Sequence, residues 1–208
     1  MNRVARRAIG KPPNSASVAE NRRFFTDDPD APIVAPKGHD ITIVEYLDYQ
    51  CPYCRTSQAA LNTLMARDKK VRVVFRDWPI FGPESERAAR VAIAAKYQGK
   101  YLAVNNALLN ASRPLNEAKI QAAAKKAGAN WPRLEADLKA HQGDIDDLLE
   151  RNHEQALLLG LTGTPAFIIG NFQIGGAITY AELEKTVREA RAKAKGLPST
   201  IRKSRQKK

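Results

Sequence analysis

Short runs of β-branched and aromatic residues alternate with longer runs of helical periodicity through the middle of the chain. Residues 41–47, ITIVEYL, and residues 71–79, VRVVFRDWP, have the composition of buried strands, and a proline ends the second. Between them, residues 55–68 carry apolar side chains at helical spacing. This order of strand, helix and strand predicts a βαβ unit.

The second half of the chain has a helical pattern before it returns to strands. Residues 84–158 are almost wholly helical in pattern, divided by glycine, proline and asparagine, with Asn116 as an expected helix cap. PAFIIG and FQIGG, on either side of Gly170 and Asn171, predict a β-hairpin. A last helix is expected after a cap at Thr179.

These patterns divide the chain into five segments. Because 43% of the residues are hydrophobic, the chain can bury the core of one domain that carries a large insertion. Proline, serine and charge dominate the beginning, which predicts an arm outside the core. The expected segments are an N-terminal arm (1–38), a first half (39–83), an inserted helical domain (84–158), a second half (159–195) and a basic tail (196–208).

The formal net charge of +12 lies at the two ends of the chain. Residues 1–23 hold six Lys or Arg against Glu20, residues 188–208 hold nine against Glu189, and the remainder sums to −1. We therefore expect solvated tails and no nucleic-acid partner, with weak attraction to anionic membranes as the alternative. No run approaches the roughly 20 apolar residues of a membrane span. The basic beginning lacks the apolar stretch of an export signal.

The chain has two cysteines, three positions apart in the stretch DYQCPYCRTS. A structural zinc site needs about four ligands, and a second cysteine pair is missing. A disulfide between Cys51 and Cys54 would close a very short loop, which constrains the unfolded chain little. Reversible thiol–disulfide exchange remains, with two buried apolar thiols as the alternative.

The order of elements resembles the thioredoxin fold, and the helical insertion resembles that of the DsbA family of bacterial disulfide oxidoreductases. The resemblance covers roughly residues 31–192, and it implies an α/β thioredoxin fold with an inserted all-helical domain. The residues that carry it are Glu45, the CPYC motif of Cys51 to Cys54, FRDWPIFGPES at 75–85 and GTPAFIIG at 163–170.

The CPYC motif is expected at the beginning of a helix, with the proline in the first turn. Cys51 would be the attacking thiolate, favoured by free backbone amides and by the helix dipole, and Cys54 the shielded resolving thiol. Pro52 and Tyr53 would tune the balance between the two. A tyrosine here resembles glutaredoxins and DsbG-like members more than the most oxidising DsbA proteins, which carry histidine.

Further roles follow from the resemblance. Thr164 and Pro165 match the loop in which the proline is cis, beside the attacking cysteine, where a substrate peptide could add as a strand. Glu45 matches the buried acid that exchanges protons with Cys54, and we expect Arg76 as its counter-charge. Three more predictions concern side chains outside this set: Asp48 and Tyr49 at the surface, His141 and His153 in solvent, and Trp78 and Trp131 as core anchors.

The resemblance implies a protein disulfide oxidoreductase, an oxidase or an isomerase, that acts on unfolded or misoxidised secreted proteins in the periplasm. It would need no metal and no cofactor beyond its cysteine pair, and a membrane redox partner would reset that pair. The N-terminal arm is the candidate for forming a homo-oligomer. The alternatives are a Cu(I)-binding thiol protein and a reductase of the thioredoxin or glutaredoxin type, which would fit a cytoplasmic location.

Overall fold

The computed structural model describes residues 22–195, which form a mixed sheet with helices on both faces. The strands lie in the order β1-β3-β2-β4-β5. They are β1 (Ile33–Val34), β2 (Ile41–Leu47), β3 (Val71–Asp77), β4 (Ala166–Ile169) and β5 (Phe172–Gly175). The helices are α2 (Arg22–Thr26), α3 (Pro52–Arg67), α4 (Pro83–Ala95), the 3-10 turn η1 (Lys96–Gln98), α5 (Tyr101–Asn110), α6 (Glu117–Lys126), α7 (Trp131–Ala140), α8 (Gln142–Leu158) and α9 (Tyr180–Ala194).

The two central strands, β2 and β3, run parallel and are joined by α3, which confirms the predicted βαβ unit. Six of the seven residues in each of these strands are buried, as expected for strands covered on both faces. Strand β4 pairs antiparallel with β2, and β5 pairs antiparallel with β4, so the predicted hairpin is also confirmed. The chain has the expected α/β thioredoxin fold.

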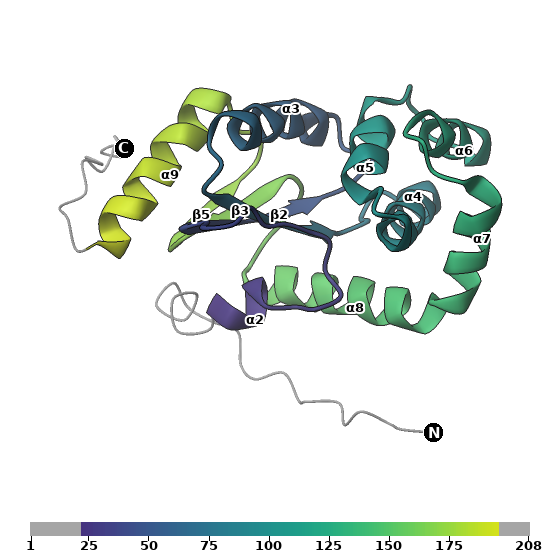
Figure 1. Ribbon diagram of the computed structural model, residues 1–208, viewed down its shortest axis with the longest axis horizontal. Coiled ribbons are helices and arrows are strands. Elements are labelled where there is room, and N and C mark those ends of the chain that lie inside the picture. The colour runs from purple at the N-terminus through teal and green to yellow at the C-terminus, as the bar shows by residue number, and fades with distance from the viewer. Residues whose placement is uncertain (1–21, 196–208) are drawn as a thin grey trace, which may run out of the picture.

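Helices cover the two faces of the sheet unequally (Figure 1). Helices α3 and α9 lie on one face, while α2 and the long α8 lie on the other. Helices α4 to α7 form a group beside the sheet, and α8 leads from this group back beneath it. The helical insertion therefore borders the end of the sheet where the loop between β2 and α3 begins.

Two helices begin at the side-chain caps that the sequence predicts, Asn116 and Thr179. The Asn116 side chain accepts a hydrogen bond from the Lys119 amide at the start of α6. Thr179 and Glu182 form a reciprocal capping box at the start of α9. Each such cap contributes about 1 kcal/mol to stability, because it satisfies amides that have no partner within the helix.

The predicted arm of residues 1–38 is wrong from residue 22 onward. Phe25 is buried in the core, and β1 pairs antiparallel with β3 as an edge strand. A buried ion pair holds this segment in place, because Asp28 accepts a hydrogen bond of 2.7 Å from Arg76 and one of 3.1 Å from Arg151. The rest of the expected arm, residues 1–21, and the basic tail, 196–208, lie outside the described residues.

No helix between residues 22 and 195 is both long enough and apolar enough to cross a membrane.

Replacing Asp28 by alanine should lower the free energy of unfolding by about 3–5 kcal/mol, because Arg76 would stay buried without its anionic partner. Urea unfolding followed by circular dichroism measures this change. Asp27→Ala is the matched control: the Asp27 side chain is 54% exposed and lies 3.9 Å from Arg72, so its loss should cost less than about 1 kcal/mol. Equal losses in the two variants would contradict the buried pair as the anchor of this segment.

Candidate active site

Cys51 occupies the N-cap of α3, where the sequence places it, and Pro52 follows in the first helical turn. Its backbone is extended, with φ −71° and ψ 119°, so the chain turns into the helix at this residue. Both cysteines are free thiols, and both are buried. The first turn of a helix presents unpaired amides, so this end of α3 favours negative charge on sulfur.

The surroundings of Cys51 favour its thiolate. A hydrogen bond from the Cys54 thiol is the largest cause that lowers the pKa of Cys51, to about 6. The backbone amides of Tyr53 and Cys54 lower this pKa further, while partial burial opposes them. A thiol with such a pKa is largely ionised at neutral pH and is therefore an effective nucleophile and leaving group.

Cys54 differs from Cys51 in the direction in which its surroundings shift the thiol pKa. Its side chain is completely buried, and this burial raises the pKa of the Cys54 thiol far above its ordinary value. The Asp48 backbone amide donates to its sulfur at 3.5 Å. Two thiols one helical turn apart thus have opposite ionisation preferences.

The loop before β4 reaches the attacking sulfur. The peptide bond between Thr164 and Pro165 is cis. The Cys51 thiol donates a hydrogen bond of 3.2 Å to the Thr164 carbonyl oxygen, across 113 positions in sequence. The Thr164 side chain also acts on Cys51 and lowers the pKa of its thiol. Thr164, Pro165 and Cys51 therefore come together as predicted from the sequence.

Glu45 is fully buried in the middle of β2. It lies between Phe75 on β3 and Phe167 on β4, and neither carboxylate oxygen has a hydrogen-bond partner among the described residues. Burial, together with the smaller effect of the Asp77 charge, raises the pKa of Glu45 to about 8. Burial is the main cause that raises the pKa of Cys54, and a charge on Glu45 raises this pKa as well.

Arg76 is not the counter-charge of Glu45, and that prediction is wrong. Register pairs Arg76 with Tyr46, one residue after Glu45, so Arg76 and Glu45 project from opposite faces of the sheet. On its own face, Arg76 binds Asp28, the Asn152 side chain and the Phe25 carbonyl oxygen. Glu45 is left without a cation at this position.

Asp48 and Tyr49 are buried, which corrects their predicted place at the surface. The Asp48 carboxylate accepts three hydrogen bonds of 2.7 Å, from the Gln50 amide, the Ile80 amide and the Ser85 hydroxyl, and one of 3.0 Å from the Phe81 amide. It thereby joins the cysteine loop to the segment before α4. The position of Asp48 could have indicated this role, because Asp48 is a polar residue that directly follows a buried strand.

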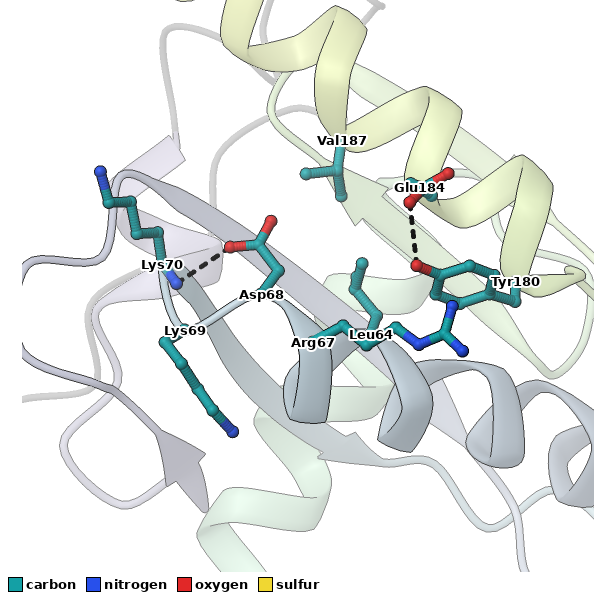
Figure 2. A pocket seen from close by; sticks show the side chains of 8 residues that line it. All are labelled: Leu64, Arg67, Asp68, Lys69, Lys70, Tyr180, Glu184 and Val187. Atoms are coloured by element: carbon teal, nitrogen blue, oxygen red, sulfur yellow. Dashed lines mark hydrogen bonds between the residues drawn. The ribbon is translucent and has the colours of Figure 1, made fainter.

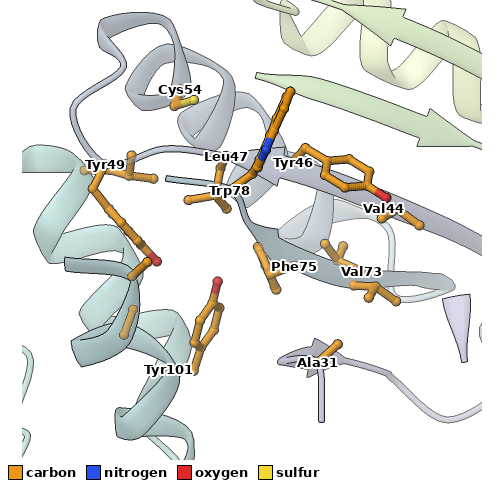
Figure 3. Close-up of a cluster of buried hydrophobic side chains, with 14 of the residues drawn as sticks. Ala31, Val44, Tyr46, Leu47, Tyr49, Cys54, Val73, Phe75, Trp78 and Tyr101 are labelled. Atoms are coloured by element: carbon orange, nitrogen blue, oxygen red, sulfur yellow. The ribbon is translucent and has the colours of Figure 1, made fainter. Parts of the chain in front are cut away.

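Tyr49 leads to a second buried acid, Asp77, which the sequence analysis missed. The Tyr49 hydroxyl donates to Asp77 Oδ1 at 2.6 Å, and the Tyr101 hydroxyl donates to Oδ2 at 3.0 Å. Figure 3 shows the two hydroxyl groups pointing toward one another beside Phe75. Burial raises the pKa of Asp77 to about 7, although the two tyrosine hydrogen bonds oppose this rise.

Arg113, in the loop between α5 and α6, holds the cysteine loop from the side of the helical insertion. Its guanidinium donates to the carbonyl oxygens of Tyr49, Gln50 and Cys51, at 3.2, 3.1 and 3.0 Å. Sequence reasoning missed this residue because the contacts span more than 60 positions. The insertion therefore fixes the backbone on which Cys51 sits.

Large apolar side chains are exposed on the two segments that meet at the cysteines. Tyr53, between the cysteines, is 63% exposed, and Phe81, whose amide binds Asp48, is 51% exposed. Ile80, also bound through its amide to Asp48, is 39% exposed. These three side chains form what we call the apolar rim.

A separate pocket lies between α3 and α9 (Figure 2). It is lined by the last turn of α3 and the start of α9, including Leu64, Tyr180 and Val187. The Tyr180 hydroxyl donates to Glu184 at 2.9 Å across its edge. Since Cys51 stands at the first turn of α3, this pocket is at the opposite end of that helix.

The remaining predicted side chains lie away from the cysteines or serve the core. His141 stacks on Tyr97 with ring centroids 3.7 Å apart, and His153 is exposed but accepts a hydrogen bond from the Trp78 indole. Trp78 is buried, and Trp131 is partly buried against the core. Within residues 22–195, no group of three or more His, Cys, Asp or Glu side chains is arranged to hold a metal ion.

Comparison with known proteins identifies the family of this site. The sequence profile of the DSBA-like thioredoxin domain matches residues 42–188, more than half of the chain. The chain belongs to this family of DSBA-like thioredoxin domains. The match includes CPYC and the Thr164–Pro165 loop.

Solved structures of this family share the whole fold. A thioredoxin-like oxidoreductase from Silicibacter pomeroyi DSS-3 is 36% identical, with a TM-score of 0.77 over 82% of this chain and 98% of that chain. The catalytic domain of Proteus mirabilis ScsC is 26% identical, with a TM-score of 0.77 over 86% of this chain and 98% of that chain. Family and structures together support thiol–disulfide oxidoreductase chemistry in general terms.

Curated relatives carry this domain as one part of a longer protein. A protein described as Na(+)/H(+) antiporter NhaA 3 from Salinispora tropica is 29% identical over 174 residues, which is 82% of this chain. The present chain spans about a quarter of the length of that relative.

In the reduced protein, one thiolate should form with a midpoint near pH 6, the pKa of Cys51. Ultraviolet absorbance of the thiolate during a pH titration measures it. Cys54→Ala should raise the midpoint, because the Cys54 hydrogen bond is the largest cause of the lowered pKa, and Cys51→Ser should abolish the step. A midpoint that does not move when Cys54 is lost would contradict this electrostatic account.

Proposed function

We propose that this protein exchanges disulfides with protein substrates through Cys51 and Cys54, and that it acts mainly as a disulfide donor. The observation that carries the proposal is the difference between the two thiols. The pKa of Cys51 is lowered to about 6, while burial raises that of Cys54 far above its ordinary value. Such a pair suits one exchange step at the ionised Cys51 and one resolving step by the neutral Cys54.

The low pKa of Cys51 also favours transfer of the disulfide from this protein to its substrate. A lowered Cys51 pKa stabilises the folded reduced protein at every pH above that pKa, and the oxidised protein has no thiolate to benefit. A reduced form that is stabilised in this way makes the disulfide a stronger oxidant. The disulfide between Cys51 and Cys54 would therefore tend to pass to substrate thiols, in an oxidase or an isomerase.

The surroundings of Cys51 suit an unfolded polypeptide. Thr164 lies beside the sulfur at a point where Pro165 has no amide to donate, so an extended substrate could pair with the Thr164 backbone. The apolar rim of Tyr53, Ile80 and Phe81 would contact apolar side chains of such a segment. Folded proteins bury their apolar side chains and already pair their extended segments, so the proposed substrates are unfolded or misoxidised proteins.

The chemistry also suggests a compartment and partners. A cysteine pair that is kept oxidised belongs in an oxidising space such as the periplasm, and we propose a membrane redox partner that resets the pair. The cysteine pair itself would be the redox centre, with no further cofactor. The part of the expected arm that the structure describes, residues 22–38, packs on its own domain, and the remainder of that arm lies outside the described residues.

Single cysteine variants test the exchange chemistry. With a reduced, unfolded disulfide protein as substrate and an excess of oxidised glutathione, Cys51→Ser should abolish catalysed disulfide formation. Cys54→Ser should instead hold a mixed disulfide between Cys51 and glutathione, visible as added mass on the intact protein, because no Cys54 thiol remains to displace the glutathione and close the active-site disulfide. Catalysis at the original rate by Cys51→Ser would reject the proposed function.

A further inference from the structure

Two buried carboxyl groups, Glu45 and Asp77, lie on one face of the sheet, and the charge of Glu45 acts on the Cys54 thiol. Register pairs Glu45 with Phe75 and Leu47 with Asp77, so Glu45 and Asp77 are diagonal neighbours on adjacent parallel strands. Both residues are completely buried. Arg76, which separates Phe75 from Asp77 in sequence, projects from the opposite face and binds Asp28. Two carboxylates in such a place repel one another, so they cannot both ionise without cost.

The two acids differ in the hydrogen bonds that they receive. Asp77 accepts from the Tyr49 hydroxyl at 2.6 Å and from the Tyr101 hydroxyl at 3.0 Å. Both oxygens of Glu45 lack a partner among the described residues. Hydrogen bonds to a carboxylate favour its charged form, and burial without them favours the neutral acid. A single negative charge shared by the pair therefore falls on Asp77.

Within residues 22–195, no cation lowers the pKa of Glu45. Strand β4 and helix α9 contribute apolar side chains to this face, from Phe167, Leu183 and Val187. Helix α9 also carries the buried Glu189 and, two residues later, Arg191. The Arg191 guanidinium is engaged elsewhere, because it binds Asp40, the residue before β2. The titratable groups that act on Glu45 or Asp77 are Cys54 on α3, Tyr101 on α5, and Asp48 and Tyr49 in the loop between β2 and α3.

We propose that Asp77, held by Tyr49 and Tyr101, is a positioning residue that carries the charge of this carboxyl pair and so keeps Glu45 protonated until Cys54 leaves the active-site disulfide. The inference rests on the proposed function, because it concerns the proton used when that disulfide opens. It assigns a role to three side chains that contact neither sulfur.

The proton and electron balance of the opening step is simple. A substrate thiolate attacks Cys51 Sγ, the bond between the two sulfurs breaks, and the bonding electron pair leaves on Cys54 Sγ. The Glu45 proton then passes to Cys54, which leaves a mixed disulfide at Cys51, a neutral thiol at Cys54 and a charged Glu45. The charge of Asp77 makes this doubly ionised state costly, so Glu45 takes a proton back from the second substrate thiol. The resulting thiolate then displaces Cys51 from the mixed disulfide.

The direct test is the titration of the carboxyl groups themselves, followed by carbon-detected NMR on the oxidised full chain, with Glu45→Gln to assign the Glu45 signal. Glu45 should titrate near pH 8 in the unmodified protein. In Asp77→Asn, which removes the neighbouring charge, its midpoint should fall by about one pH unit. A Glu45 midpoint that is unchanged in folded Asp77→Asn would overturn the proposal.

A second variant keeps the test decisive if Asp77→Asn does not fold. Tyr101→Phe removes one donor to Asp77 and leaves the cysteine loop intact, so the Asp77 midpoint should rise above its value near pH 7. An Asp77 midpoint that does not move would equally overturn the assignment.

Because these titrations need no turnover, their failure is distinguishable from failure of the proposed function. A protein that shows the shifted Glu45 midpoint but exchanges no disulfides would reject the function and keep the carboxyl pair. The kinetic consequence is then checked in the active enzyme. The rate at which a small thiolate opens the disulfide, corrected for the ionised fraction of that thiol, should begin its fall on the alkaline side at a lower pH in Asp77→Asn than in the unmodified chain.

Discussion

The parallel register between β2 and β3 is the constraint on which the active site depends. Because side chains alternate along a strand, residues paired in this register share a face, and their sequence neighbours take the other face. One face thereby receives Glu45 and Asp77, next to α3 and the cysteines. The other receives Tyr46 and Arg76, next to α8 and the N-terminal segment. A shift of one residue would exchange the two sets and place a guanidinium below Cys54.

The ends of these strands supply the rest of the site. Strand β2 ends at Leu47, and the next four residues lead directly into α3, so the chain between sheet and cysteines is short and strongly held. Asp48 binds this loop to the segment before α4, and Arg113 binds it to the helical insertion. The insertion thus contributes to the geometry of Cys51 although its helices carry no sulfur. Rigid backbone around a reactive group preserves the hydrogen bonds that set its pKa.

Local patterns predicted most of the fold and the centre of the site. Strand and helix periodicity were sufficient for the βαβ unit and the hairpin, and the caps at Asn116 and Thr179 followed from local chemistry. The long-range polar contacts could not be predicted in this way. Asp28 lies 48 positions from Arg76, and Arg113 lies 62 positions from Cys51, so neither contact leaves a periodic signal. The polar N-terminal segment therefore reads as an arm in the sequence, and the partner of Arg76 is Asp28 and not the expected Glu45.

The reduction potential of the Cys51–Cys54 pair tests the central claim most directly, since the claim is that the stabilised Cys51 thiolate makes this protein a disulfide donor. Equilibration with glutathione buffers and thiol trapping measures it. With a Cys51 pKa of about 6, below the ~7 of thioredoxin and above the ~3.5 of DsbA, the potential should lie between their values of about −270 and −120 mV. A potential at or below about −270 mV would contradict the account and make the protein a reductase.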